Sequence, residues 1–150
     1  MEARGRTGGV TVVIDASIAA AWLLPEEDSD AAEALIAALS GRPPVPSLFW
    51  HEARNILIMA ERRGRIVAGE AAAAMGRLRR LPLEDAGAGS DGVVLALAMA
   101  HGLTAYDAAY LTLAQERDLP LATLDQKLAG AARREGVALL GPLGRSADFA

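Results

Sequence analysis

Apolar residues along the chain fall into two patterns, short continuous runs and longer stretches with helical spacing. The run Val-Thr-Val-Val-Ile at residues 10–14 is β-branched throughout and apolar except for Thr11, as expected of a parallel strand buried on both faces. Residues 119–124 and 137–140 are predicted strands of the same kind, residues 81–83 form a brief one, and the proline-rich loop 42–46 has room for a very short strand.

Seven stretches between these runs are predicted helices, several of them bounded by capping or breaking residues. Pro25 stops the first, Asp28 or Ser29 caps the second, and Ser47 caps the third. The predicted helices cover residues 16–24, 29–40, 48–63, 69–80, 91–101, 106–117 and 126–135. Strands that alternate with helices predict a single α/β domain with a short, mostly parallel central sheet flanked by about seven helices.

The chain has 150 residues and is 52% hydrophobic and 23% charged, which suits one globular domain. We expect residues 1–9 to be a flexible leader, residues 10–141 the folded domain, and residues 142–150 a loose tail. The absence of cysteine excludes disulfides and thiolate chemistry, and two histidines argue against a histidine-rich metal site. No apolar run approaches the ~20 residues of a membrane span, and the basic leader lacks a signal-peptide core, so a cytoplasmic protein is expected.

Four acidic residues draw attention because each lies beside or within an apolar segment. A carboxylate among apolar residues is costly unless something neutralises it, so four of them suggest one shared cationic partner. A hard divalent metal ion is the natural candidate, and metal-assisted phosphodiester cleavage is the chemistry that follows. The four candidate catalytic and metal-binding residues are Asp15, Glu52, Asp107 and Asp125.

The predicted elements give these acids a place to meet. Asp15 and Asp125 each follow a predicted strand, at the end of the sheet where open parallel sheets bind ligands. Asp107 lies in the first turn of a predicted helix, where the macrodipole favours negative charge, and Glu52 comes from the third helix. Taken singly, acids placed like Asp15 and Asp125 are usually just helix caps, and Asp107 could be a first-turn acid that serves only helix stability. Their joint occurrence favours the metal site.

Polar side chains accompany three of the acids at short spacing. Hydrogen bonds from such neighbours orient ligating carboxylates, although single hydroxyls at these places are more often ordinary caps. The candidate supporting residues are Ser17, Asn55 and Thr123.

The net charge of −4 is unlike that of a general nucleic-acid binder, but the charge is segregated. Residues 54–80 contain seven arginines and two glutamates, a net charge of +5. Arg62, Arg63 and Arg65 are therefore candidate contacts to an RNA backbone, and the alternative is that they only solvate a helix surface.

Residues 13–17, 52–55, 103–110 and 123–125 together resemble a PIN-domain nuclease, and within that family the VapC-type toxins of bacterial toxin–antitoxin pairs. The resemblance runs from about residue 10 to residue 140. It implies an endoribonuclease that depends on Mg²⁺ or Mn²⁺, commonly forms a homodimer and is inhibited by a cognate antitoxin. By position, the four acids match the four family acids, and Ser17, Asn55 and Thr123 match the polar residues that accompany them.

Other functions are open at this stage. A non-catalytic α/β module that binds metal or peptide, or a PIN nuclease outside toxin–antitoxin systems, would share these residues. A dinucleotide-binding enzyme is excluded by the lack of a glycine-rich turn after the first strand. A P-loop is excluded because the only lysine, Lys127, lies between Gln126 and Leu128.

Large apolar side chains cluster near the end of the first predicted helix and the start of the third. They serve either as core or as a groove that receives an antitoxin helix, for which aromatic anchors are well suited. The candidate antitoxin contacts are Trp22, Leu23, Phe49 and Trp50.

Overall fold

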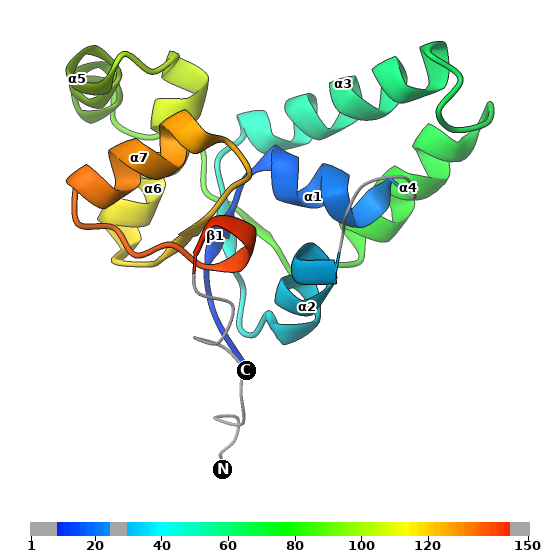
Figure 1. Cartoon of the computed structure of the whole chain (residues 1–150), viewed down its shortest axis with the longest axis horizontal. Helices are drawn as coiled ribbons and strands as arrows, with labels where there is room; N and C mark the ends of the chain where they lie inside the picture. Colours follow the sequence, from blue (N-terminus) through cyan, green and yellow to red (C-terminus); the bar gives the residue numbers. More distant parts are fainter. Residues whose placement is uncertain (1–8, 25–29, 145–150) are drawn as a thin grey trace.

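The computed structural model describes residues 9–24 and 30–144 and contains the seven expected helices (Figure 1). The α3–α4 pair and the α5–α6–α7 group lie on opposite sides of β1, with α1 between them in the view (Figure 1). The α/β fold predicted from the sequence is confirmed. The helices are α1 Ala16–Leu23, α2 Asp30–Ala38, α3 Leu48–Arg62, α4 Glu70–Arg79, α5 Asp91–His101, α6 Ala105–Arg117 and α7 Gln126–Arg134.

The strands are very short and pair in parallel. β1 (Val13–Ile14) pairs with β4 (Leu121–Ala122), and β2 (Pro44–Val45) pairs with β3 (Glu84–Asp85). Two isolated parallel bridges, Val10↔Leu39 and Leu121↔Leu139, occur in addition to these ladders. The expected run at residues 137–140 therefore contributes one bridge in place of a strand.

The expected strand at residues 81–83 was misplaced. The amide of Leu81 bonds to the Leu78 carbonyl, and the amide of Leu83 bonds to the Leu81 carbonyl, so both are used in the turn that ends α4. The first amide free for the neighbouring strand is that of Glu84, which bonds to the Pro43 carbonyl at 2.9 Å. Pairing therefore begins at residue 84.

One of the predicted helix caps, Ser47, differs from expectation. Ser47 precedes α3, but its backbone is helical and its hydroxyl makes no capping bond. The hydroxyl instead donates to Asp85 Oδ1 at 3.0 Å, and so ties the start of α3 to the end of β3. The candidate caps of α2, Asp28 and Ser29, lie outside the described residues.

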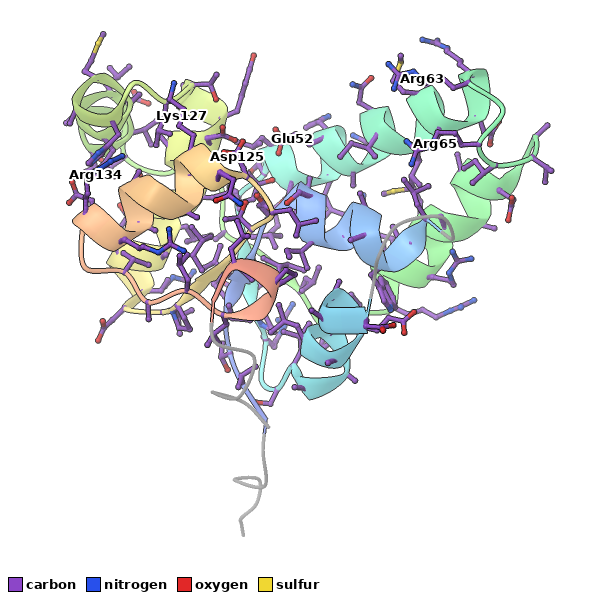
Figure 2. All side chains as sticks on the ribbon, in the orientation of Figure 1. Glu52, Arg63, Arg65, Asp125, Lys127 and Arg134 are labelled. Atoms are coloured by element: carbon purple, nitrogen blue, oxygen red, sulfur yellow. The ribbon has the colours of Figure 1, made fainter. Side chains whose placement is uncertain are left out.

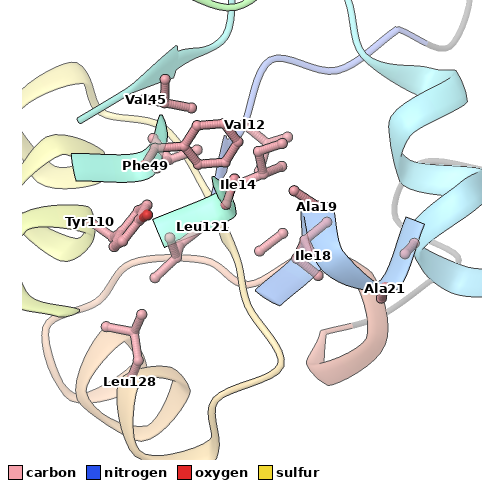
Figure 3. Close-up of a cluster of buried hydrophobic side chains, with 14 of the residues drawn as sticks. Val12, Ile14, Ile18, Ala19, Ala21, Val45, Phe49, Tyr110, Leu121 and Leu128 are labelled. Carbon is pink, nitrogen blue, oxygen red and sulfur yellow. The ribbon is translucent and has the colours of Figure 1, made fainter. Parts of the chain in front are cut away.

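The core surrounds β1 and the middle of α6 (Figure 3). Residues 108–114 of α6 are all buried. Tyr110 lies in the same buried cluster as Phe49 of α3 and Leu121 of β4. The apolar side chains of β1 and β4 are fully buried, as expected of a parallel strand pair covered on both faces. This packing fixes the ends of β1 and β4, and with them the acids that follow.

The part of the expected loose tail that the structure describes is folded. Gly141–Leu143 forms a short 3₁₀ helix, η2, and Arg133 donates to the Leu143 carbonyl at 3.0 Å. The expected leader, apart from Gly9, lies outside the described residues. Among the described residues, no single helix combines the length and apolar character needed to cross a bilayer; α5 and α6 together have both, but meet at a bend of 115°.

Candidate active site

The four predicted acids line one cavity of about 260 Å³, and each comes from a different part of the chain. Asp15 follows β1, Glu52 lies on α3, Asp107 on α6, and Asp125 follows β4. In Figure 2 the labelled Glu52 and Asp125 lie near each other where α3 and α7 approach. A larger cavity of about 580 Å³ beside η2 includes no carboxylate, so its size does not make it the better candidate. Of the predicted supporting residues, Ser17 and Asn55 also line the acidic cavity.

Asp15 is the most constrained of the acids and is only 5% exposed. Its Oδ1 caps α1 by accepting from the amides of Ser17 and Ile18 and from the Ser17 hydroxyl at 2.5 Å. Its Oδ2 accepts from the Thr123 hydroxyl. One side chain can therefore both cap α1 and line the cavity, because the cap uses Oδ1 and, among the described residues, Oδ2 accepts from Thr123 alone.

Ser17 and Thr123, the predicted supporting residues, connect the ends of the two strands through hydrogen bonds. The Ser17 hydroxyl accepts from the Leu124 amide at 2.9 Å, and the Thr123 hydroxyl accepts from the Asp125 amide at 2.9 Å. Each hydroxyl thus links the turn after β1 to the turn after β4. Asp125 itself caps α7 by accepting from the Leu128 amide at 2.9 Å through Oδ1.

Asp107 and Glu52 face the cavity from two helices. Asp107 lies in the first turn of α6, where its amide donates to the capping hydroxyl of Thr104. Glu52 accepts a 2.6 Å hydrogen bond through Oε1 from the hydroxyl of Tyr110 on α6. Both carboxylates are partly buried. Asn55, one turn after Glu52, is exposed at the rim.

Burial raises the pKa of three of these acids. The pKa of Asp15 rises to about 6, mainly through burial, with a smaller contribution from the charge of Asp107. Burial is also the largest cause for Glu52, whose pKa is raised further by Asp107, and for Asp107, whose pKa is raised further by Asp125. The repulsion expected between the acids is present, but desolvation is the larger effect.

The donor set fits a hard divalent cation, although the side chains do not form a ready-made cage. Among the described residues, no three Asp, Glu or His side chains are positioned together to hold one ion. Mg²⁺ does not need such a cluster, because it keeps several waters and takes one or two carboxylates. An all-oxygen pocket with raised pKa values would gain stability from a cation.

Two residues of the site were missed by the sequence interpretation. Tyr110 lies one helical turn after Asp107, a spacing that places both on one face of a helix and could have indicated it. Lys127, two residues after Asp125, lies close enough for its charge to lower the pKa of Asp107.

The candidate RNA contacts lie away from the cavity. Arg62, Arg63 and Arg65 are exposed, and Figure 2 shows Arg63 and Arg65 at the far end of α3 from Glu52. Eleven residues separate Glu52 from Arg63, which corresponds to about 16 Å along a helix. The arginines are therefore not part of the acidic pocket.

The candidate antitoxin contacts divide into core and surface. Phe49 is fully buried, and Leu23 and Trp50 are nearly so. Trp50 stacks edge-on against Phe49 and is covered by the Arg79 guanidinium 3.8 Å from its ring centre. These three side chains serve the core, which was the alternative reading of the set. Trp22 is the member that keeps partial exposure.

Fold and site together define an α/β protein with an acidic, cation-compatible pocket at the carboxyl ends of parallel strands. The model of the PIN domain family matches residues 12–134, and the chain belongs to that family.

Known relatives agree with this assignment. Ribonuclease VapC3 of Pyrobaculum aerophilum is 36% identical over 129 residues, covering 79% of this chain and 92% of the relative. The crystal structure of PAE2754 from Pyrobaculum aerophilum matches with a TM-score of 0.62 and 27% identity, covering 83% and 82% of the two chains. Mycobacterium tuberculosis VapC20, a sarcin–ricin loop cleaving toxin, matches with a TM-score of 0.61 and 13% identity, covering 81% and 95%, and shows likeness of fold alone.

Proposed function

We propose that the protein is a metal-dependent endoribonuclease that acts as the toxin of a toxin–antitoxin pair. The observation that carries the proposal is the convergence of four carboxylates, from four separate segments, in one cavity. Membership of the PIN domain family and the ribonuclease relative support RNA as the substrate. The site residues are Asp15, Glu52, Asp107 and Asp125, and a toxin that cleaves cellular RNA acts in the cytoplasm.

The side chains would hold the cation and leave room for the scissile phosphate. A bound Mg²⁺ or Mn²⁺ would supply the positive charge that stabilises the reacting phosphate and lowers the pKa of an attacking water. Asp15 is held in one orientation by the hydroxyls of Ser17 and Thr123. Glu52 and Asp107 present carboxylates from the facing helices, and Asp125 does so from the start of α7.

Cleavage of total RNA by metal-stripped protein tests the function. We expect no cleavage after metal removal, and recovery when Mg²⁺ or Mn²⁺ is restored. The control is Asp15→Asn protein purified in parallel, which reports contaminating ribonuclease. Full activity of the stripped protein, with an inactive control, would contradict the metal mechanism.

We infer that the arginine-rich end of α3 binds the RNA backbone outside the cleavage site. The side chains of Arg62, Arg63 and Arg65 are exposed, and they lie at the far end of α3. This position suits contact with an RNA strand that continues beyond the acidic cavity. Replacing all three with Ala should weaken binding and reduce the salt dependence of affinity by about two to three charges. Arg134→Ala, on the opposite side of the molecule in Figure 2, is the control. An unchanged salt dependence would favour a purely solvating role.

We also infer that a cognate antitoxin packs on the end of α1 around Trp22. Trp22 is partly exposed and lies beside the buried Leu23, so it has surface to offer a partner helix. An antitoxin arginine that reached the carboxylates would compete with the cation. Trp22→Ala should weaken antitoxin binding clearly and change the melting temperature little. Phe49→Leu, a change in the buried core, should lower the melting temperature and leave the antitoxin affinity of the folded protein unchanged. If Trp22→Ala destabilises the protein but its folded fraction binds the antitoxin normally, Trp22 is a core residue and the antitoxin binds at another surface.

We infer a homodimer that buries the apolar surface of α5. Four of the six large, exposed hydrophobic residues in the described part of the chain lie on α5 or in the first turn of α6: Val93, Leu95, Met99 and Tyr106. An apolar patch of this kind on one helix marks a protein interface, and symmetric homodimers are the commonest assemblies.

A further inference from the structure

Among the residues that the structure describes, Tyr110 is the only tyrosine that lines the acidic cavity. Its ring is held by the core and its hydroxyl by a hydrogen bond. Its ring is 1% exposed and packs in the core around β1 (Figure 3). Its hydroxyl reaches the cavity and donates to Glu52 Oε1 at 2.6 Å. The contact joins α6 to α3 across the pocket. A buried ring cannot swing aside, so the position of the hydroxyl is set by the core.

This hydrogen bond commits one of the two oxygens of Glu52. A phenol carries one hydrogen to donate, and a carboxylate accepts through two oxygens. A phenol is protonated at neutral pH, so the Tyr110 hydroxyl is the donor and the Glu52 carboxylate is the acceptor in this bond. The phenol holds one lone pair of Oε1 and turns that oxygen toward α6, so Oε2 is the oxygen that has no donor among the described residues and is open to a cation.

The number of oxygens that a carboxylate offers matters for the choice of cation. Ca²⁺ takes six to eight oxygens and often binds both oxygens of one carboxylate. Mg²⁺ is smaller, requires a near-octahedral arrangement and takes a carboxylate through one oxygen, with water filling the remaining places. A glutamate restricted to one oxygen therefore suits Mg²⁺ better than Ca²⁺.

We propose that Tyr110 is a positioning residue that makes Glu52 a one-oxygen ligand and thereby selects Mg²⁺ over Ca²⁺. This inference rests on the proposed function, because it assumes that the acidic pocket binds a divalent cation. Tyr110 acts through Glu52 and does not itself bind the ion. Removal of its hydroxyl frees Oε1, so that Glu52 can bind a larger cation through both oxygens.

The test is Tyr110→Phe, which keeps the buried ring and removes the hydroxyl. Affinities for Mg²⁺ and Ca²⁺ are measured by calorimetry on metal-free protein without RNA. We expect the ratio of Ca²⁺ to Mg²⁺ affinity to rise by about 10-fold, the lower end of what second-layer hydrogen bonds contribute at metal sites. Tyr106→Phe is the matched control, because Tyr106 lies one turn earlier on α6, is 64% exposed and does not line the cavity; its ratio should stay that of the unmodified protein.

A second variant keeps the proposal testable if Tyr110→Phe folds poorly. Glu52→Asp leaves the ring and hydroxyl of Tyr110 in place but draws the carboxylate back from the phenol by one methylene. The same rise in the ratio of Ca²⁺ to Mg²⁺ affinity is expected. Circular dichroism confirms that each variant is folded before titration.

The outcomes separate this inference from the proposed function. If the unmodified protein binds Mg²⁺ and the ratio is unchanged in Tyr110→Phe, or both affinities fall equally, the selectivity role is wrong and the nuclease proposal stands. If the unmodified protein binds neither cation, the proposed metal-dependent function fails, and the selectivity role fails with it.

Discussion

Helices α5 and α6 follow each other directly and are both rich in apolar residues, yet they have opposite surroundings. Residues 108–114 of α6 are all buried, whereas Leu97 is the only buried residue of α5. The reason is the number of neighbours: α6 contacts α5, α7, β1, β2 and β4, while α5 packs chiefly on α6 and lies at the edge of the molecule (Figure 1). An apolar helix can therefore be core or exposed surface, and composition does not distinguish the two.

The two helices also differ in their relation to the site. α6 carries Asp107 and Tyr110 into the acidic cavity, and no residue of α5 lines it. The same core that buries the middle of α6 holds these two side chains in place. α5 contributes surface, which we assign to self-association. The following predictions test this division.

The largest effect is expected at the first-turn acid of α6, Asp107, and the equivalent acid of α5, Asp91, serves as the control. Asp107→Asn should reduce RNA cleavage by about 10³-fold, or about 4 kcal/mol of transition-state stabilisation, because it removes a charge from the cation site. Asp91→Asn, the equivalent change in the first turn of α5, should leave the rate within about twofold. Rates are measured under single-turnover conditions. Comparable losses in both variants would mean that α5 also serves the site.

The next effect is on stability. Leu111 of α6 is fully buried and Leu95 of α5 is 56% exposed. Leu111→Ala should lower the free energy of unfolding by about 3 kcal/mol, since it creates a core cavity. Leu95→Ala should lower it by less than about 1 kcal/mol. Denaturant titration at concentrations low enough to keep the chain monomeric measures both. Equal losses would show that α5 is as firmly packed as α6.

The stability of the metal-free protein should depend on pH because of Asp15, which lies between the core and the acidic cavity. The pKa of Asp15 is raised in the folded state to about 6, so folding favours the protonated form. Its contribution is present below the unfolded pKa near 4 and is lost as pH rises through about 6. Without metal, Asp15→Asn should therefore be more stable than the unmodified protein by about 2 kcal/mol near neutral pH, and this difference should disappear near pH 4. A difference that does not vary with pH would contradict the assignment.

The smallest effect concerns the exposed face of α5. Met99→Glu should weaken self-association by about 2 kcal/mol, because a charge would be placed in the apolar contact. Sedimentation across a concentration series measures this change. Val67→Glu is the control, since Val67 is 69% exposed and Met99 84%, but Val67 lies in the turn between α3 and α4. Equal weakening by both variants, or a monomer throughout, would rule out the α5 interface.

Local signals in the sequence were sufficient for the helices and for the four acids. Apolar spacing with caps at Asp15 and Asp125 marked the elements, and both side chains cap helices in the structure. The acids were recognisable because a carboxylate beside an apolar run is rare without a partner. Strand bounds were less accurate, because pairing in strands of two residues depends on which amides the preceding turn leaves free. Residues 81–83 show this, and so does the single bridge at Leu139.

The aromatic residues show where local reasoning ends. Phe49, Trp50 and Trp22 have similar apolar character in the sequence, yet the first is fully buried, the second is covered by Arg79, and the third reaches the surface. The hydrogen bond from Tyr110 to Glu52 spans 58 positions and has no local signal beyond the helical spacing from Asp107. Neighbours brought together by folding decide such contacts.

The sequence alone determined the order of the helices, the four acids that line one cavity and the lack of cysteine chemistry, because each follows from residue type and short-range spacing. Only the tertiary structure decided which apolar helix is core and which is surface, and that one oxygen of Glu52 is held by Tyr110. It also showed that burial, more than mutual repulsion, raises the pKa of the acids. The physical reason is that burial and long-range hydrogen bonds depend on all the surrounding elements, whereas helix caps and apolar periodicity depend on a few residues in a row.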